Sequence, residues 1–373
     1  MALMGIDAGS SGCKAIIFSK TGQQLSECYI EYPPSDNPYE IDGNLIWENV
    51  KTIIKSCTGK CDEKITAICV SSFGESFVPV DIDGNVLMKT MLYTDKRGRK
   101  ECDFLIEKLG EKQIMEIAGA TPQPMYSLPK MMHIREYFPD IYDKTYKFLL
   151  IGSFIIYKLS GEFVTDYSLA ARTMAFDIIK KEWSQTLLDC AGIDREKLTS
   201  LLPSGKVAGE VKSQIASELG LTKSGKDENE KIKVVTGGHD QICAALGAGV
   251  IDSTVAIDGT GTVECITPIF SGPILSENFL GNNYACVPYV IDGMYATYAF
   301  NFTGGAILKW YKNNFALYES MLAKEQGISV YKLLDENASK NPTELIVIPH
   351  FAGSATPDMN ENARGAFLGL KFD

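Results

Sequence analysis

Alternating apolar and polar positions at the start of the chain predict two strands joined by a tight turn. The first strand, over residues 4–7, ends at Asp7, and the second covers residues 13–19. The turn between them has the sequence Gly9, Ser10, Ser11 and Gly12. Because a turn rich in Gly and Ser exposes successive backbone N–H groups, it can bind an anion such as a phosphate. An ordinary β-hairpin with a glycine-rich turn explains the same pattern.

Asp7 lies at the strand end that faces this turn. Its carboxylate is suited to hold a hydrated Mg²⁺ beside bound phosphates. Two other phosphate motifs are excluded. The chain has no Gly-x-x-x-x-Gly-Lys-Ser/Thr string, and the turn opens a strand, whereas the Gly-x-Gly-x-x-Gly motif opens a helix.

The pattern continues with a third strand over residues 27–32, a helix over residues 46–55 and a buried strand over residues 65–71. The order strand, strand, strand, helix, strand is typical of the ribonuclease-H-like half of an actin-type fold. We therefore predict an α/β protein.

A second segment has the same pattern as the opening hairpin. A strand over residues 254–258 is followed by a polar turn and a strand over residues 263–268. The turn has the sequence Gly259, Thr260, Gly261 and Thr262. Two such hairpins suggest a duplicated domain with a phosphate chain between the halves. Asp258 is given no metal role, because it lies one residue nearer to its glycine than Asp7 does, and neighbouring strand residues point in opposite directions.

Asp240 lies where a strand over residues 231–238 meets a helix over residues 241–249. One hypothesis is a general base, since a helix N-terminus stabilises an ionised carboxylate that can accept a hydroxyl proton. The alternative is a helix N-cap, for which Asp is a favoured residue.

Polar residues also follow the strand over residues 65–71. A hairpin of residues 77–82 and 86–93 is expected there, with Glu75 before it and Asp95 and Arg97 after it. Because ligands bind at strand ends in α/β sheets, Glu75, Asp95 and Arg97 are candidates for a sugar-binding wall. The alternative is that they are solvated loop charges.

The amino-acid composition argues against some classes of function. The 373 residues carry a net charge of −11, which argues against nucleic-acid binding, and no apolar run is long enough for a membrane span. The ten cysteines are dispersed, as in a reducing compartment, so we expect a cytoplasmic protein. The expected partner is a small molecule. A homodimer is compatible with the sequence, which does not define the oligomeric state.

Four blocks in this order resemble the FGGY family of carbohydrate kinases, which includes xylulose, glycerol and gluconate kinases. They are residues 6–12 (Ile-Asp-Ala-Gly-Ser-Ser-Gly), 237–241 (Gly-Gly-His-Asp-Gln), 258–261 (Asp-Gly-Thr-Gly) and 363–370 (Ala-Arg-Gly-Ala-Phe-Leu-Gly-Leu). Asp95 and Arg97 also resemble the family's Asp-x-Arg.

The resemblance implies two actin-like domains of the superfamily that contains sugar kinases, actin and heat-shock chaperones. Residues 1–245 would form the N-terminal, sugar and phosphate side, and residues 246–373 the C-terminal, nucleotide side. It also implies ATP, Mg²⁺ and phosphoryl transfer to a sugar hydroxyl of a ketose, polyol or sugar acid.

The resemblance also implies a role for each site residue. Asp240 would be the base, and Asp7 would hold Mg²⁺. The turns at residues 9–12 and 259–261 would bind the phosphates, and Gly305 would contact the nucleotide. Glu75, Asp95, Arg97 and Asp240 would meet the sugar.

Three departures qualify the resemblance. Glu75 stands where xylulose kinases carry the His of Gln-Met-His-Gly, so xylulose itself is in doubt. The usual late Gly-Glu-Arg is Gly353-Ser354-Ala355. The sequence stops at Asp373, before the segment that holds the adenosine in full-length relatives. We therefore expect an incomplete second domain that exposes apolar surface, and a chain that binds nucleotide poorly and turns over slowly or not at all.

Two alternative functions are associated with the same fold. A non-catalytic sugar sensor or scaffold with the same fold would agree with the missing segment but not with the presence of Asp7 and Asp240. A chaperone-like ATPase lacks support, because no peptide-binding domain follows.

Overall fold

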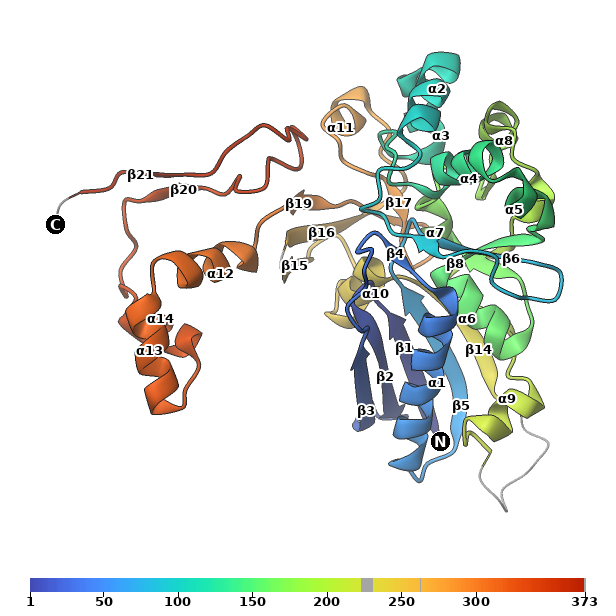
Figure 1. Cartoon of the computed structure of the whole chain (residues 1–373), viewed down its shortest axis with the longest axis horizontal. Helices are drawn as coiled ribbons and strands as arrows, with labels where there is room; N and C mark the ends of the chain where they lie inside the picture. The colour runs from blue at the N-terminus through green and yellow to red at the C-terminus, as the bar shows by residue number, and fades with distance from the viewer. Residues whose placement is uncertain (223–230, 262, 372–373) are drawn as a thin grey trace.

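The computed structural model describes residues 1–222, 231–261 and 263–371. A six-stranded sheet forms the first half, in the order β13-β14-β5-β1-β2-β3 (Figure 1). Its strands are β1 (Ala2–Ala8), β2 (Gly12–Ser19), β3 (Gln24–Glu31), β5 (Ile65–Ser72), β13 (Val207–Glu210) and β14 (Lys233–His239). The adjacent strands β14, β5 and β1 are parallel, and the other pairs are antiparallel. The predicted order of strands and helix is confirmed.

Two helices cover one face of this sheet: α1 (Gly43–Gly59) contacts β1, β2 and β3, and α6 (Ile151–Ser160) contacts β5, β13 and β14. Helix α1 buries Ile46, Val50 and Ile53 at helical spacing, and the Asp42 carboxylate accepts a hydrogen bond from the N–H of Asn44 at 2.8 Å. Alternate residues of β1 are buried against these helices.

A largely helical region lies beyond one end of the sheet (Figure 1). Its helices are α2 (Arg99–Leu109), α3 (Glu111–Ala118), α4 (Ser127–Tyr137), α5 (Pro139–Lys144), α7 (Tyr167–Ala171), α8 (Gln185–Ala191) and the 3₁₀ turn η1 (Arg195–Lys197). Helix α9 (Ser213–Glu218) precedes β14. The short strand pairs are β4 (Glu40–Ile41) with β7 (Thr90–Met91), β6 (Phe77–Val80) with β8 (Lys147–Leu150), β9 (Val164–Asp166) with β12 (Ser200–Leu202), and β10 (Phe176–Asp177) with β11 (Glu182–Trp183).

The second sheet follows α10 (Asp240–Gly247). Its strands are β15 (Ala256–Thr260), β16 (Glu264–Ser271), β17 (Val287–Pro288), β18 (Met294–Ala296) and β19 (Ala299–Asn301), with α11 (Glu277–Leu280) between β16 and β17. All pairs in this sheet are antiparallel, and β15 and β16 form the second predicted hairpin. Thr262 of its turn lies outside the described residues.

The remaining elements extend away from both sheets (Figure 1). They are α12 (Gly305–Asn314), α13 (Leu317–Gln326), α14 (Val330–Asn337), and the paired strands β20 (Ile346–Ile348) and β21 (Ala366–Leu368). The expected exposure of apolar side chains in the second half is confirmed here, for example at Leu308, Phe315, Leu317 and Met321.

Two hydrophobic clusters form the core. One joins β1, β2 and β5 to α1 and α6, and residues 232 and 234 complete it. The other joins the helical region to the second sheet: Phe176 and Trp183 belong to the same cluster as Ile242, Val287 and Tyr295. The second cluster therefore crosses from the first half of the chain to the second. The domain boundary at residues 245/246 stays a prediction.

The predicted hairpin of residues 77–82 and 86–93 is wrong in most of its pairing. Strand β6 pairs with β8, and β7 pairs with β4. Only an isolated bridge between Val80 and Val86 links the two segments. Each segment instead pairs with a strand that is more distant in the sequence.

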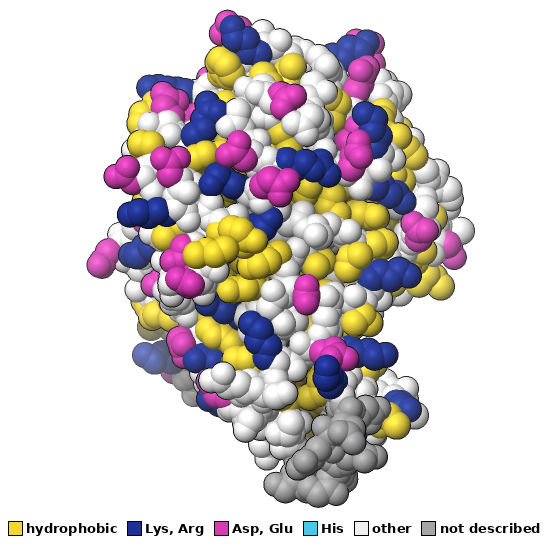
Figure 2. Space-filling view, turned by 90° about the vertical axis from the view of Figure 1, so that its right-hand side faces the viewer, with side chains coloured by type: hydrophobic (Ala, Val, Ile, Leu, Met, Phe, Trp, Pro, Cys, Tyr) yellow, Lys and Arg dark blue, Asp and Glu magenta, His cyan; other side chains and the backbone are white. Residues whose placement is uncertain are grey.

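Both signs of charge are interspersed over the face shown in Figure 2. Within the described ranges, no helix has both the length and the hydropathy needed to cross a bilayer.

The pairing of β14 with β5 depends on Gly237. The register shifts between Thr236 and Gly238, and a Cβ atom on Gly237 would lie 2.2 Å from the carbonyl oxygen of Val70. We therefore expect Gly237→Ala to lower the free energy of unfolding by about 1–3 kcal/mol.

Urea unfolding followed by circular dichroism tests this prediction. Gly5→Ala is the matched control, because a Cβ on Gly5 meets no atom within 4 Å and its strand is in the same sheet. A Gly237→Ala protein as stable as the Gly5→Ala protein would contradict the argument.

Candidate active site

The carboxyl ends of three parallel strands meet at one edge of the first sheet. Asp7 of β1 is paired with Ser71 of β5, and Ser71 is paired with Gly238 of β14. The Ser71 hydroxyl donates a hydrogen bond to Oδ1 of Asp7 at 3.0 Å. Asp7 is accessible to solvent, but the surrounding edge desolvates it enough to raise the pKa of its carboxyl, and the Ser71 hydrogen bond offsets part of that shift.

Asp240 lies at the same edge, as the first residue of α10. The N-cap hypothesis is wrong in detail: His239 occupies the N-cap position, and Oδ1 of Asp240 accepts the N–H of Gln241 at 2.7 Å. Burial, with the negative charge of Asp7 next in importance, raises the pKa of Asp240 to about 7. A carboxyl with a pKa near neutrality is suited to exchange a proton at physiological pH.

Glu75 is paired with a buried cation. Its Oε1 atom accepts the Nε–H of Arg172 at 2.5 Å, and the two side chains are 5% and 9% exposed. The Arg172 guanidinium lies over the rings of Tyr126 and Tyr298, at 5.2 and 5.4 Å from their centroids. Glu75 also adopts a φ of 61°, which is uncommon for a residue with a side chain. The strained backbone and the ion pair fix its carboxylate.

Asp95 and Arg97 are paired with each other. Arg97 donates its backbone N–H to Oδ1 of Asp95 at 2.8 Å and its Nε–H to Oδ2 at 2.9 Å, and its guanidinium also contacts Glu40. Burial alone raises the pKa of Asp95, but the hydrogen bonds from Arg97 outweigh it and lower that pKa. Glu75 and Asp95 are 4% and 7% exposed, so the alternative of solvated loop charges is wrong for these two carboxylates.

Lys130 lies behind this group and is fully buried. Its Nζ donates to the carbonyl oxygen of Leu92 at 2.6 Å. Burial lowers the pKa of Lys130 to about 8, and the charges of Glu75 and Asp95 oppose that shift. Lys130 therefore helps to neutralise two buried carboxylates.

The turn at residues 9–12 is closed by a hydrogen bond from the N–H of Gly9 to the carbonyl of Gly12 at 2.9 Å. A Cβ atom on Gly12 would lie 2.4 Å from the carbonyl oxygen of Ile30, so this position requires glycine. Within the described part of the chain, the amides of Ser10 and Ser11 donate to no protein acceptor. These N–H groups remain available to an anion.

The second turn is joined to Gly305. The N–H of Gly305, the first residue of α12, donates to the carbonyl oxygen of Gly261 at 2.7 Å. The predicted residues Gly259, Thr260, Gly261 and Gly305 are thus brought together at one helix N-terminus. In the described residues, no hydrogen bond or ion pair joins this group to the turn at residues 9–12.

The donor set at Asp7 fits a hydrated Mg²⁺ ion. Magnesium in phosphate-binding sites is held by one or two carboxylates, with water and phosphate oxygens completing its shell. Asp7 supplies such a carboxylate at a solvent-accessible edge. No group of three or more His, Cys, Asp or Glu side chains suited to a metal is found over residues 1–222, 231–261 and 263–371.

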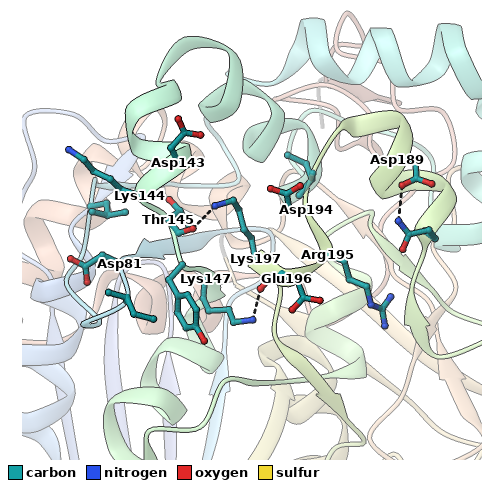
Figure 3. Close-up of a pocket in the computed structure, with 15 residues that line it drawn as sticks. Asp81, Asp143, Lys144, Thr145, Lys147, Asp189, Asp194, Arg195, Glu196 and Lys197 are labelled. Carbon is teal, nitrogen blue, oxygen red and sulfur yellow. Dashed lines mark hydrogen bonds between the residues drawn. The ribbon is translucent and has the colours of Figure 1, made fainter.

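A pocket of about 900 Å³ lies elsewhere, between α5, η1 and the loop at Asp81 (Figure 3). Two of its three lysines are bound to backbone carbonyls: Nζ of Lys147 donates to Leu198 at 2.9 Å, and Nζ of Lys197 donates to Thr145 at 2.6 Å (Figure 3). These two lysines therefore stabilise the backbone segments that border the pocket.

The prediction from the sequence missed the partners of the site residues. These partners are Tyr126, Lys130, Arg172, His239 and Tyr298. A buried Lys within the apolar run of residues 128–132 was a detectable signal, because charged side chains are seldom fully buried without a role.

Comparisons with known proteins agree with this geometry. The model of the FGGY family of carbohydrate kinases, N-terminal domain, matches residues 2–247, and the C-terminal domain model matches residues 256–373. The xylulose kinase of Lactococcus lactis is 28% identical over 99% of this chain and 71% of its own length. The autoinducer-2 kinase of Escherichia coli K12 is 28% identical over 100% of this chain and 70% of its own length. A solved structure of ligand-bound xylulose kinase from Lactobacillus acidophilus is 25% identical, with a TM-score of 0.82 over 99% of this chain and 72% of that one.

The buried Glu75–Arg172 pair leads to a test by double-mutant cycle. Arg172→Met leaves the Glu75 carboxylate buried without its cation, so we expect a loss of about 3–5 kcal/mol in the free energy of unfolding. Glu75→Gln together with Arg172→Met should recover most of that loss. Equal effects of Glu75→Gln in the parent and in the Arg172→Met background, measured by urea unfolding, would show that the pair is not coupled.

Asp240 leads to a test of stability against pH. Its pKa is about 7 in the folded protein, above the ordinary value of 3.8, so folding favours the protonated form. The ionised carboxylate therefore destabilises the protein increasingly as pH rises from 4 to 7. We expect Asp240→Asn to be about 1–3 kcal/mol more stable than the parent at pH 8, and no more stable at pH 4. Thermal unfolding across this pH range measures the difference, and a gain independent of pH would contradict the assignment.

Proposed function

Because the chain belongs to the FGGY family of carbohydrate kinases, we propose that it transfers the γ-phosphate of ATP to a sugar hydroxyl, with Asp240 as the general base. One observation carries this proposal: a carboxylate with a pKa of about 7 lies at a helix N-terminus, at the same strand-end edge as Asp7 and the glycine turn. The enzyme is a phosphotransferase with an alcohol group as acceptor.

In the proposed step, the sugar hydroxyl oxygen forms a bond to the γ-phosphorus, and the bond between that phosphorus and the leaving oxygen of ADP breaks. The hydroxyl proton moves to the carboxylate of Asp240. Phosphoryl transfer requires mainly alignment and stabilisation of charge, so one carboxylate base and a set of backbone donors suffice. The backbone N–H of Gln241 at the start of α10 offsets part of the burial that raises the pKa of Asp240, so that at pH 8 the carboxylate is ionised and can accept the proton.

The two glycine turns would bind the phosphate chain. The free amides of Ser10 and Ser11 would bind phosphate oxygens from the first sheet, and residues 259–261 with Gly305 would bind the nucleotide from the second. Asp7 would hold Mg²⁺ through water, and the bound ion would neutralise charge on the transferred phosphate. As predicted from the sequence, residues 1–245 would carry the sugar and residues 246–373 the nucleotide.

The proposed substrate is a ketose, a polyol or a sugar acid. Its hydroxyls would meet Glu75, Asp95, Arg97 and Asp240. Glu75 and Asp95 are held by Arg172 and Arg97, so they would act as fixed hydrogen-bond acceptors. Two of the relatives are named for xylulose and autoinducer-2, which are different small molecules. We further propose that the reaction takes place in the cytoplasm, where ATP is available.

A non-catalytic sugar sensor is the alternative function. The relatives reported above are all named as kinases, so none of them supports it.

The variant Asp240→Ala separates the two functions. For a kinase, we expect kcat for ATP-dependent phosphorylation to fall by about two to four orders of magnitude, because the base is lost. The dissociation constant for the sugar, measured by calorimetry without nucleotide, should change only a few-fold.

Asp252→Ala is the matched control, since Asp252 is an exposed aspartate a few residues after α10 and should leave kcat unchanged. A panel of ketoses, polyols and sugar acids supplies the substrate. Retention of full turnover in Asp240→Ala would overturn the role of this residue.

A further inference from the structure

We propose that Tyr298 and His239 are positioning residues that hold the ionised carboxylate of Asp240 for the reaction. In this arrangement the Tyr298 hydroxyl donates a hydrogen bond to Nδ1 of His239, which leaves the ring N–H on Nε2, on the side that faces Oδ1 of Asp240. The name relay is used below for this series of three side chains. The inference rests on the proposed function, because it assigns a role relative to the general base.

The geometry provides both contacts. The Tyr298 hydroxyl lies 3.0 Å from Nδ1 of His239, and Nε2 of His239 lies 3.3 Å from Oδ1 of Asp240. The two rings meet edge to face, with centroids 5.7 Å apart and an interplanar angle of 75°. His239 and Tyr298 are 6% and 8% exposed, so water does not readily replace either contact.

The protonation states favour one direction of donation. Burial, with the charge of Arg172 second, holds the pKa of His239 well below its ordinary range, so the ring is neutral and carries one N–H. Burial likewise raises the pKa of Tyr298 well above its ordinary range, so the hydroxyl keeps its proton. With a proton on Nδ1, the lone pair of Nε2 would face an ionised carboxylate. With the proton on Nε2, Nδ1 can accept the Tyr298 hydroxyl, and the N–H dipole at Nε2 faces the carboxylate of Asp240 with favourable electrostatics.

The surroundings fix the imidazole ring in this position. The backbone N–H of His239 donates to the Ser168 hydroxyl at 2.9 Å, and that hydroxyl donates to Asp166 at 2.6 Å. A Cβ atom on Gly74 would lie 3.0 Å from Cδ2 of His239, so β5 and its following loop pack closely against the ring. The ring therefore has little freedom to turn away from Asp240.

The relay leaves one oxygen of Asp240 free. Oδ1 accepts the Gln241 N–H at 2.7 Å and also lies 3.3 Å from Nε2 of His239. Within the described residues, no hydrogen bond is made to Oδ2. The oxygen with fewer donors is the more basic one, so Oδ2 is the atom suited to take the sugar proton.

Tyr298 also links the two halves of the chain. It lies between β18 and β19 of the second sheet, whereas His239 ends β14 of the first. Its ring lies under Arg172, which binds Glu75. The orientation of the base therefore depends on a residue from the half of the chain that is expected to bind the nucleotide.

Histidine NMR tests the relay without any need for activity. The chain has only three histidines, so ¹⁵N-histidine labelling gives few signals, and a His239→Gln sample assigns the one that matters. At pH 8, where Asp240 is ionised, we expect His239 of the ligand-free protein to be protonated on Nε2 and unprotonated on Nδ1. In Tyr298→Phe, Nδ1 loses its donor, and the spectrum should show a mixture of the two tautomers.

Kinetics supply the second measurement. Tyr298→Phe should lower kcat about five- to tenfold, as expected for the loss of one positioning hydrogen bond, and should change KM for the sugar by no more than about twofold. His239→Gln can place an amide donor near the position of Nε2 and should retain more activity than His239→Asn, which cannot reach it.

Tyr289→Phe is the matched control. Tyr289 is a buried tyrosine of the same sheet region whose hydroxyl donates to the Val250 carbonyl at 2.8 Å, away from His239. It should lose a similar amount of stability but keep the parental tautomer and kcat.

The outcomes separate the two proposals. An Nδ1–H tautomer in the parent at pH 8, or a parental tautomer and kcat in Tyr298→Phe, would overturn the relay. The predicted tautomers in a protein that phosphorylates no sugar would support the hydrogen-bonded geometry but refute the proposed function.

Discussion

The site depends on the parallel pairing of β1, β5 and β14. Parallel strands place their carboxyl ends at one edge, so Asp7, Ser71 and the residue that opens α10 come together although they are far apart in the sequence. Gly237 permits this alignment, because a side chain there would collide with the backbone of β5. The carboxylates of Asp7 and Asp240 are consequently close enough for each charge to affect the other.

This arrangement brings several negatively charged side chains together, which is electrostatically unfavourable. Asp7, Asp240, Glu75 and Asp95 lie around one edge, and burial disfavours the ionised forms of the three aspartates. Arg172, Lys130 and Arg97 offset the charge, and two of these cations are themselves buried. Because Arg172 and Arg97 are each held by several contacts, the carboxylates that they bind are fixed before any ligand binds, as expected for a preorganised site.

The sequence alone predicted what is local. The opening hairpin, its second copy and the junction at Asp240 depend on neighbouring residues, and the structure contains all three. The hairpin expected before Asp95 was wrong, because β6 and β7 pair with strands that no local pattern identifies. Arg172 and Tyr298 were missed for the same reason, because each contacts a partner that is about 60 to 100 residues away in the sequence. The roles of the predicted site residues stay predictions.

The late arrival of β14 has a consequence for biosynthesis. Strand β5 is synthesised early and pairs with β1, but its other neighbour, β14, is synthesised only after the whole helical region. Until then β5 is an edge strand with unpaired backbone groups, a state prone to pairing with other chains. While the helical region folds, the edge of β5 must not pair with another chain. Faster folding of that region therefore shortens the time during which the incomplete first sheet can aggregate on the ribosome.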